Sequence, residues 1–153
     1  MAMPLVRQMV TGPGIVTSIT NSDVRQLATL MLESYRGTAD DDGETLQDAL
    51  QEIEDTFGGK YGVLLRRASF VARESPDSDL VSATIVTRFE ELPLLAFSMT
   101  HSSYKRQGFA RMLLQRCVNA LLDENYTILR LVVTNDNQPA VQLYRSMGFV
   151  EER

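Results

Sequence analysis

Basic residues surround a glycine at the expected start of a helix, between residues 105 and 111. The segment follows an expected strand and reads KRQGFAR. The first N–H groups of a helix have no partner within it, and together with the helix dipole they attract anions. Gly108 lets a phosphate approach the backbone closely, and the small Ala110 keeps the next turn open. Positive charge comes from Lys105, Arg106 and Arg111, so the segment predicts a site for a diphosphate.

Two widespread phosphate-binding motifs are absent from the chain. It contains neither the GxxxxGK[ST] loop nor the GxGxxG fingerprint. A surface loop in which the glycine only turns the chain, with solvated basic side chains, would carry the same residues. The loop by itself leaves both interpretations open.

The same segment resembles the acyl-CoA signature of the GNAT superfamily of N-acetyltransferases, Gln/Arg-x-x-Gly-x-Gly/Ala. Gly108 and Ala110 match this signature, whereas Lys105 stands where the family has Gln or Arg. A second block resembles the C-terminal motif of the family: Leu131-Val132-Val133, then Asn137, Ala140, Leu143, Tyr144, Gly148 and Phe149. Two motifs in the right order are more specific than one. The resemblance is close over residues 92–151 and rests on element order before them.

The resemblance implies an α/β fold in which acyl-CoA lies between two splayed strands. Backbone groups near residues 98–100 would hold the pantetheine and polarise the thioester, and Gln107 to Arg111 would hold the diphosphate. Asn137 would bond the pantetheine arm, and Tyr144 would lie near its sulfur. The implied cofactor-binding residues are Ser98, Met99, Thr100, Lys105, Arg106, Gln107, Gly108, Phe109, Ala110, Arg111, Asn137 and Tyr144.

Tyr144 is the expected catalytic residue. In direct acyl transfer to an amine, the departing thiolate needs a proton, and a phenol near that sulfur can act as the general acid. By spacing alone, Tyr144 belongs to an apolar helical stripe with Ala140, Leu143 and Met147, which is typical of a core residue. The resemblance favours the catalytic interpretation over the structural one.

The sequence assigns no general base. Glu90 and Glu91 precede the strand that leads to the thioester site, but such a pair is also typical of a solvated turn. Ser98 is polar on an apolar strand and could bind a water, and water alone could take the proton of the amine. We expect His101 to make a structural contact, and Cys117 to be a buried, inert thiol on the inner face of a helix.

A run of carboxylates without Lys or Arg extends from Asp40 to Asp55. Asp40, Asp41 and Asp42 occupy the connection between the first two expected helices, which flanks the acceptor entrance in the family. Carboxylates there would attract a cationic amine such as a polyamine, an aminoglycoside-like compound or a basic peptide. The three aspartates are therefore the candidate acceptor-binding residues. The alternative is a solvated loop followed by ordinary acidic residues in the first turn of a helix.

Hydrophobic periodicity predicts a single α/β domain over residues 1–153, with a mixed sheet and the order β-α-α-β-β-β-α-β-α-β. Residues 1–14 are a lead-in that ends in a Gly-Pro-Gly turn. The expected strands are 15–20, 69–73, 80–89, 92–100, 127–133 and one that begins at 149, and the expected helices are 24–35, 44–57, one that begins at 108, and 137–147.

Many family members continue past the Gly-Phe motif into another strand, whereas this sequence ends at Arg153. Either the lead-in Met1–Thr11 or a partner subunit would fill that sheet edge, or the site would be unusually open. An exposed edge also invites pairing between chains, so a homodimer is one expected arrangement.

Composition bounds the function class. The chain has 153 residues, 44% hydrophobic and 23% charged, which fits one ordinary globular domain. Its net charge of −5 disfavours general nucleic-acid binding. With no apolar run near the roughly 20 residues of a membrane span and no visible secretory signal, we expect a cytoplasmic protein that does not bind membranes. One cysteine and one histidine give no basis for a metal site.

The function implied is an N-acetyltransferase that moves the acetyl group of acetyl-CoA to a primary amine by direct attack. The alternative from another class is a non-catalytic acyl-CoA-binding sensor or regulatory module, which would keep the phosphate site without turnover. Transfer of an acyl chain longer than acetyl is also open.

Overall fold

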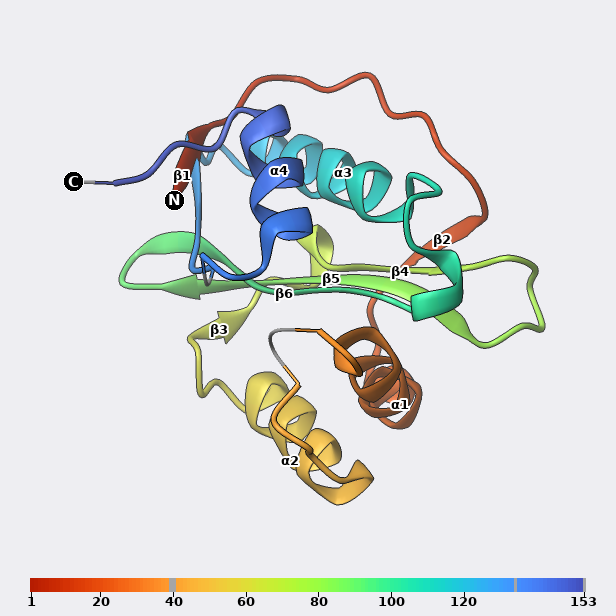
Figure 1. Cartoon of the computed structure of the whole chain (residues 1–153). Coiled ribbons are helices and arrows are strands. Elements are labelled where there is room, and N and C mark those ends of the chain that lie inside the picture. The colour runs from red at the N-terminus through yellow and green to blue at the C-terminus, as the bar shows by residue number, and fades with distance from the viewer. Residues whose placement is uncertain (39–40, 134, 153) are drawn as a thin grey trace.

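A mixed sheet lies between two layers of helices (Figure 1). The computed structural model describes residues 1–38, 41–133 and 135–152. The strand order is β1-β7-β6-β5-β4-β2, with β3 paired to β5, and among the described strands only the β6–β7 pair is parallel. The strands are β1 (Ala2–Pro4), β2 (Ile15–Ser18), β3 (Val63–Leu64), β4 (Phe70–Arg73), β5 (Leu80–Phe89), β6 (Leu92–Thr100) and β7 (Ile128–Leu131).

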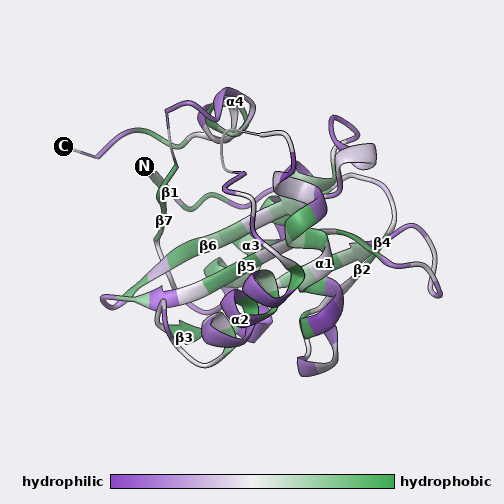
Figure 2. Ribbon diagram, turned by 60° about the horizontal axis from the view of Figure 1, so that its bottom comes forward, coloured by the Kyte–Doolittle hydropathy of each residue, from purple (hydrophilic) through white to green (hydrophobic). Residues whose placement is uncertain are grey.

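Each face of the sheet is covered by a pair of helices. The helices α1 (Val24–Tyr35) and α2 (Leu46–Phe57) cover one face, and α3 (Phe109–Asp123) and α4 (Gln138–Met147) cover the other. One core cluster joins Ile85 and Met99 of the sheet to α1 and α2, and another joins Val86 and Leu95 to α3 and α4. Figure 2 shows the hydrophobic residues gathered along β5 and β6, between these layers. Among the described residues, no helix has both the length and the apolar character needed to cross a membrane.

Local sequence signals fix where the helices begin and end. The α2 helix starts two residues later than its charge pattern suggests, because Thr45 caps it: the Thr45 hydroxyl accepts from the Asp48 N–H, and the Asp48 carboxylate accepts from the Thr45 N–H. The bond from the Thr45 N–H lowers the pKa of the Asp48 carboxyl. At α4, the side chain of Asn137 accepts from the Ala140 N–H, and Gly148 ends the helix in the left-handed conformation.

The expected α/β fold with a mixed sheet is confirmed, and two details at its edge differ. The sequence predicts a final strand at Phe149 and Val150, but Val150 forms only a single bridge, with Ala2. The lead-in, in turn, contributes the strand β1, which runs antiparallel to β7. Such short segments carry no alternation that a sequence pattern could reveal.

The lead-in therefore fills the outer edge of β7. Beyond β1 it crosses α3, where the backbone N–H and C=O of Gln8 both bond to the side chain of Asn119, at 2.8 and 3.0 Å. An exposed ion pair between Arg7 and Asp123 lies beside this contact. Of the three arrangements expected for this edge, the structure contains the one in which the lead-in covers it.

A β-bulge and a divergence of strands open the sheet in its centre. The register between β5 and β6 shifts at Ala96. Ile85 lies opposite Phe97, and the next residue, Val86, lies opposite Leu95, so Ala96 is the extra residue of the bulge. The parallel pairing of β6 with β7 ends at Leu95, although β6 continues to Thr100. The last part of β6 consequently has no pairing with β7 along its edge.

Candidate functional site

A cavity of about 620 Å³ lies where β6 leaves β7. Its lining comes from the end of β6, the loop after it, the first turn of α3, the inner side of α4 and the C-terminal end of α1. The two segments that carry the sequence motifs thus border one space. Three cationic side chains and one carboxylate, Asp136, line it, so its charge favours an anion.

The first turn of α3 is built to accept an anion. Gly108 caps the helix at φ +92°, and no side chain of the described residues caps the helix there. A Cβ at Gly108 would meet no described atom of the protein within 4 Å, so the space in front of the helix is open. The N-terminal N–H groups of this 15-residue helix therefore border the cavity without a side chain in the way.

The three cations that line this cavity have different surroundings. The Lys105 ammonium donates to the Ser34 carbonyl at 2.7 Å, and burial lowers the pKa of this lysine. The Arg111 guanidinium donates to the hydroxyl of Ser146 at 2.6 Å, which joins α3 to α4. Arg106 is exposed at φ +65° and lines the cavity.

Ten of the twelve residues implied for the cofactor line this cavity, and Met99 and Gln107 do not. The side chain of Met99 is buried in the core against α1 and α2, which leaves only its backbone for the implied role. The side chain of Gln107 donates to the carbonyl of Ser103 instead. The ten are Ser98, Thr100, Lys105, Arg106, Gly108, Phe109, Ala110, Arg111, Asn137 and Tyr144.

The sequence offered two interpretations of Tyr144, a core aromatic residue and a residue of the cofactor site, and its surroundings have features of both. Its side chain is only 8% exposed and belongs to the core cluster of α3 and α4. Its ring packs edge-on against that of Phe149, with the ring centroids 5.6 Å apart. It also lines the cavity that Ser98 and Asn137 border. Core packing thus fixes the orientation of a phenol at the cavity wall.

The remaining candidate residues lie outside the cavity lining. Glu90 and Glu91 form the exposed tip of the β5–β6 hairpin, both with positive φ, where Glu91 pairs with Arg88. The Nδ1 atom of His101 accepts from the Ser103 N–H and caps a short 3-10 helix. Cys117 is fully buried, and burial raises the pKa of its thiol far above the usual range.

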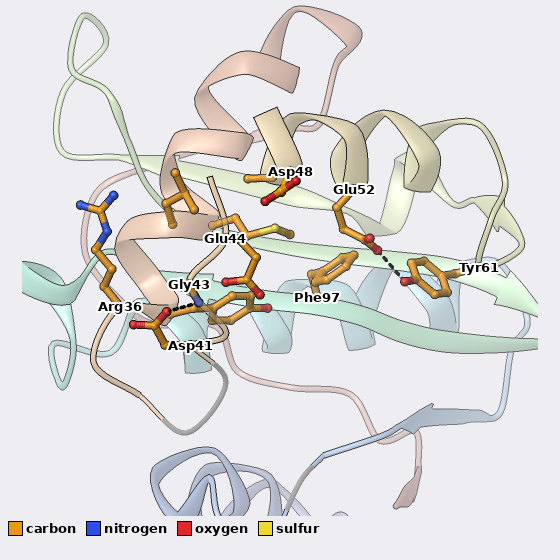
Figure 3. A pocket seen from close by; sticks show the side chains of 12 residues that line it. Arg36, Asp41, Gly43, Glu44, Asp48, Glu52, Tyr61 and Phe97 are labelled. Carbon is orange, nitrogen blue, oxygen red and sulfur yellow. Dashed lines mark hydrogen bonds between the residues drawn. The ribbon is translucent and has the colours of Figure 1, made fainter. Parts of the chain in front are cut away.

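A second cavity, of about 550 Å³, lies on the α1–α2 side of the sheet (Figure 3). Four carboxylates and one guanidinium line it, so its charge favours a cation. Tyr35, the last residue of α1, lines both cavities, which places them side by side. The charged residues are Arg36, Asp41, Glu44, Asp48 and Glu52.

Of the two described aspartates among the three predicted to bind the acceptor, Asp41 lines this cavity and Asp42 does not. Its carboxylate accepts from the N–H groups of Gly37 and Gly43, both at 3.0 Å, and these bonds lower its pKa. Asp41 therefore shapes the loop as well as adding charge. Asp42 is exposed and outside the lining, and Asp40 lies outside the described residues.

Glu52 and Tyr61 line the acidic cavity side by side, and neither is among the candidate site residues predicted from the sequence. The Tyr61 hydroxyl donates to Glu52 Oε1 at 2.5 Å, and Lys60 pairs with Glu52 Oε2 at 3.2 Å. The bond to Glu52 raises the pKa of Tyr61. The ring of Tyr61 packs edge-on against the ring of Phe97 in β6, with the ring centroids 6.0 Å apart. The spacing of Asp48 and Glu52, one helical turn apart, was the available signal for a shared face.

Comparisons with known proteins agree with this architecture. Over most of its length the chain resembles PH1933 from Pyrococcus horikoshii OT3, with a TM-score of 0.73 and 19% identity, covering 91% of this chain and 90% of that one. It also resembles the ribosomal-protein-S18-alanine N-acetyltransferase from Escherichia coli, with a TM-score of 0.69 and 20% identity, covering 92% of this chain and 79% of that one. A third similar structure is the PaiA N-acetyltransferase from Thermoplasma acidophilum in complex with coenzyme A, with a TM-score of 0.69 and 16% identity, covering 90% of each chain. At these identities the likeness establishes the fold.

The sequence itself matches no curated protein. It does match the model of the acetyltransferase (GNAT) family, over residues 29–149. That match includes α1 from residue 29 onward, all of α2, and both motifs that border the cationic cavity. The chain therefore belongs to the acetyltransferase (GNAT) family.

Proposed function

We propose that this protein is an acetyl-CoA-dependent N-acetyltransferase whose acceptor is a cationic primary amine. The observation that carries the proposal is the contact of two cavities of opposite charge at Tyr35. One cavity offers cations and helix N–H groups to an anionic cofactor, and the other offers carboxylates to a cation. A transferase for these two reactants needs both sites next to each other.

The residues present fit acetyl-CoA, which supplies an acetyl group activated as a thioester. The N–H groups at the start of α3 and the side chain of Arg106 would hold its diphosphate. Asn137 and the end of β6 near Ser98 would hold the pantetheine arm. Tyr144 would donate its phenolic proton to the departing sulfur, because its ring is fixed by the core at the wall of the same cavity.

The acidic cavity would bind the acceptor. Its carboxylates attract a protonated amine and raise its local concentration. The rings of Tyr61 and Phe97 beside Glu52 add faces that favour a cation. Asp41 would contribute charge and hold the loop, and Asp40 and Asp42 stay in the proposal as its neighbours. A polyamine, an aminoglycoside-like compound or a basic peptide has the required charge.

The experiment that tests the proposal is calorimetric titration with acetyl-CoA, CoA and ATP, followed by a screen of amines for thiol release. We expect saturable binding of acetyl-CoA and CoA, weak binding of ATP, and thiol release with cationic amines. Absence of CoA binding would contradict the cofactor assignment. Binding without thiol release across the screen would favour the sensor or regulatory module instead.

Glu52 is the carboxylate whose replacement we expect to affect the acceptor most. In Glu52→Gln the cavity loses one negative charge and a charge-assisted bond, so the acceptor KM should rise about tenfold while the Kd for CoA stays within about twofold. Glu54→Gln is the matched control, since Glu54 is exposed on the same helix and lies outside the lining. Equal KM values for the two variants would remove Glu52 from the acceptor site.

A further inference from the structure

Ser34, near the end of α1, joins this helix to the cationic cavity. Ser34 is 4% exposed, and its hydroxyl and its carbonyl both bond to residues of the cofactor side. Its hydroxyl accepts from the backbone N–H of Thr100, the last residue of β6, at 3.2 Å. Its carbonyl accepts from the ammonium of Lys105, in the loop before α3, at 2.7 Å. The last turn of α1 is thus held by the strand and the loop that border the cationic cavity.

That same turn forms part of the acidic cavity. Leu32, Tyr35 and Arg36 line the acidic cavity, while Ser34 and Tyr35 line the cationic one. A shift of this turn would therefore move the acceptor wall. The last carbonyls of a helix lack intrahelical partners and carry the negative end of its dipole, so an ammonium that bonds one of them stabilises the end of the helix. The bond from Lys105 to the Ser34 carbonyl is therefore a clamp on the end of α1.

Lys105 connects the loop before α3 to the last turn of α1. It lies three positions before Gly108, and the loop between them borders the cationic cavity. A diphosphate at the start of α3 would fix this loop, and a fixed loop holds the Lys105 ammonium against Ser34. Lysine also stands where the acyl-CoA signature has Gln or Arg, so in this chain an ammonium is the donor to the Ser34 carbonyl.

We propose that Lys105 is a positioning residue that couples the two sites, so that occupation of the cationic cavity by CoA strengthens acceptor binding in the acidic one. The inference rests on the proposed acetyltransferase function. By linkage, the acceptor would strengthen CoA binding by the same factor. The alternative role for Lys105 is a charge that only attracts the diphosphate, as Arg106 would.

The test compares Lys105→Met, Lys105→Arg and Arg106→Met. Both methionine variants remove one positive charge from the same loop and keep an apolar side chain. Both should weaken CoA binding, measured by calorimetry, to a similar extent. Only Lys105→Met should raise the acceptor KM at saturating acetyl-CoA by about fivefold or more, the lower end of typical coupling between sites. Lys105→Arg, which keeps a donor for the Ser34 carbonyl, should restore the KM.

A second readout does not depend on turnover. The N–H of Arg36 bonds to the carbonyl of Leu32, and the N–H of Thr38 to that of Tyr35, so hydrogen exchange at these amides reports the end of α1. CoA should slow this exchange in the wild type and in Arg106→Met but not in Lys105→Met. If Lys105→Met matches Arg106→Met in both acceptor KM and CoA-induced protection, the coupling is wrong while the acetyltransferase proposal stands. A wild type without CoA binding or thiol release overturns the proposed function itself.

Discussion

Tyr144→Phe is expected to lower kcat about 100-fold and to leave the Kd for CoA within about twofold, because general acid catalysis contributes at least that much. The variant removes only the phenolic hydroxyl, and the ring that packs against Phe149 in the core remains. Loss of the proton donor should affect the chemical step and not the binding of CoA. Steady-state kinetics with the best amine of the screen, together with calorimetry, measures both quantities.

A matched control separates catalysis from packing. Tyr126 packs against the same core cluster but lies outside both cavities, so Tyr126→Phe should keep kcat near that of the wild type. The melting temperatures of both variants show whether either change disturbs the fold. If Tyr144→Phe turns over as fast as Tyr126→Phe, then Tyr144 is a core aromatic residue and the acid lies elsewhere.

Gly108→Ala is expected to weaken CoA binding by about 100-fold, since the loss of one or two N–H bonds to a charged diphosphate costs about 1.5–3 kcal/mol for each bond. The new methyl group meets no described protein atom within 4 Å, so it projects into the open space where the diphosphate would lie. The φ of +92° also strains any residue other than glycine, which costs about 1–2 kcal/mol of stability. Calorimetry with CoA measures the loss of affinity.

Gly59→Ala controls for the strain in that experiment. Gly59 has a φ of +102°, and a Cβ there would likewise meet no atom of the described chain within 4 Å. It lies just after α2, outside both cavities. The two variants should lose similar stability in urea unfolding, whereas only Gly108→Ala should lose affinity for CoA. Equal affinity in the two variants would contradict the assignment of the diphosphate to the start of α3.

The sequence predicted the long elements because their signals are local. Residues 80–89 and 92–100 are continuous apolar or alternating runs, and they form β5 and β6 with those bounds. The loop of residues 105–111 is one contiguous segment, so the hypothesis of an anion site there needed no knowledge of the fold. The short strands β1 and β3 form because β7 and β5 offer them free edges, and a sequence pattern cannot reveal that.

The acidic cavity and the clamp at Ser34 depend on contacts between distant residues. Glu52, Tyr61 and Phe97 come from three separate segments, and only folding brings the two rings beside the carboxylate. Lys105 and Ser34 are 71 positions apart, and the lysine looked like one more phosphate ligand. Sequence reasoning therefore predicted an acidic acceptor region but emphasised Asp40 to Asp42 rather than Glu52.

The pairing of β1 with β7 has a consequence for synthesis on the ribosome. Among the described strands, Ala2–Pro4 is made first and its partner, Ile128–Leu131, is made last, followed by Val150, which bridges Ala2 from the other side. Ala2–Pro4 therefore cannot pair with β7 until the residues between these two strands have been produced. Closure of this edge is a late, long-range step, of the kind that slows folding and exposes nascent chains to aggregation.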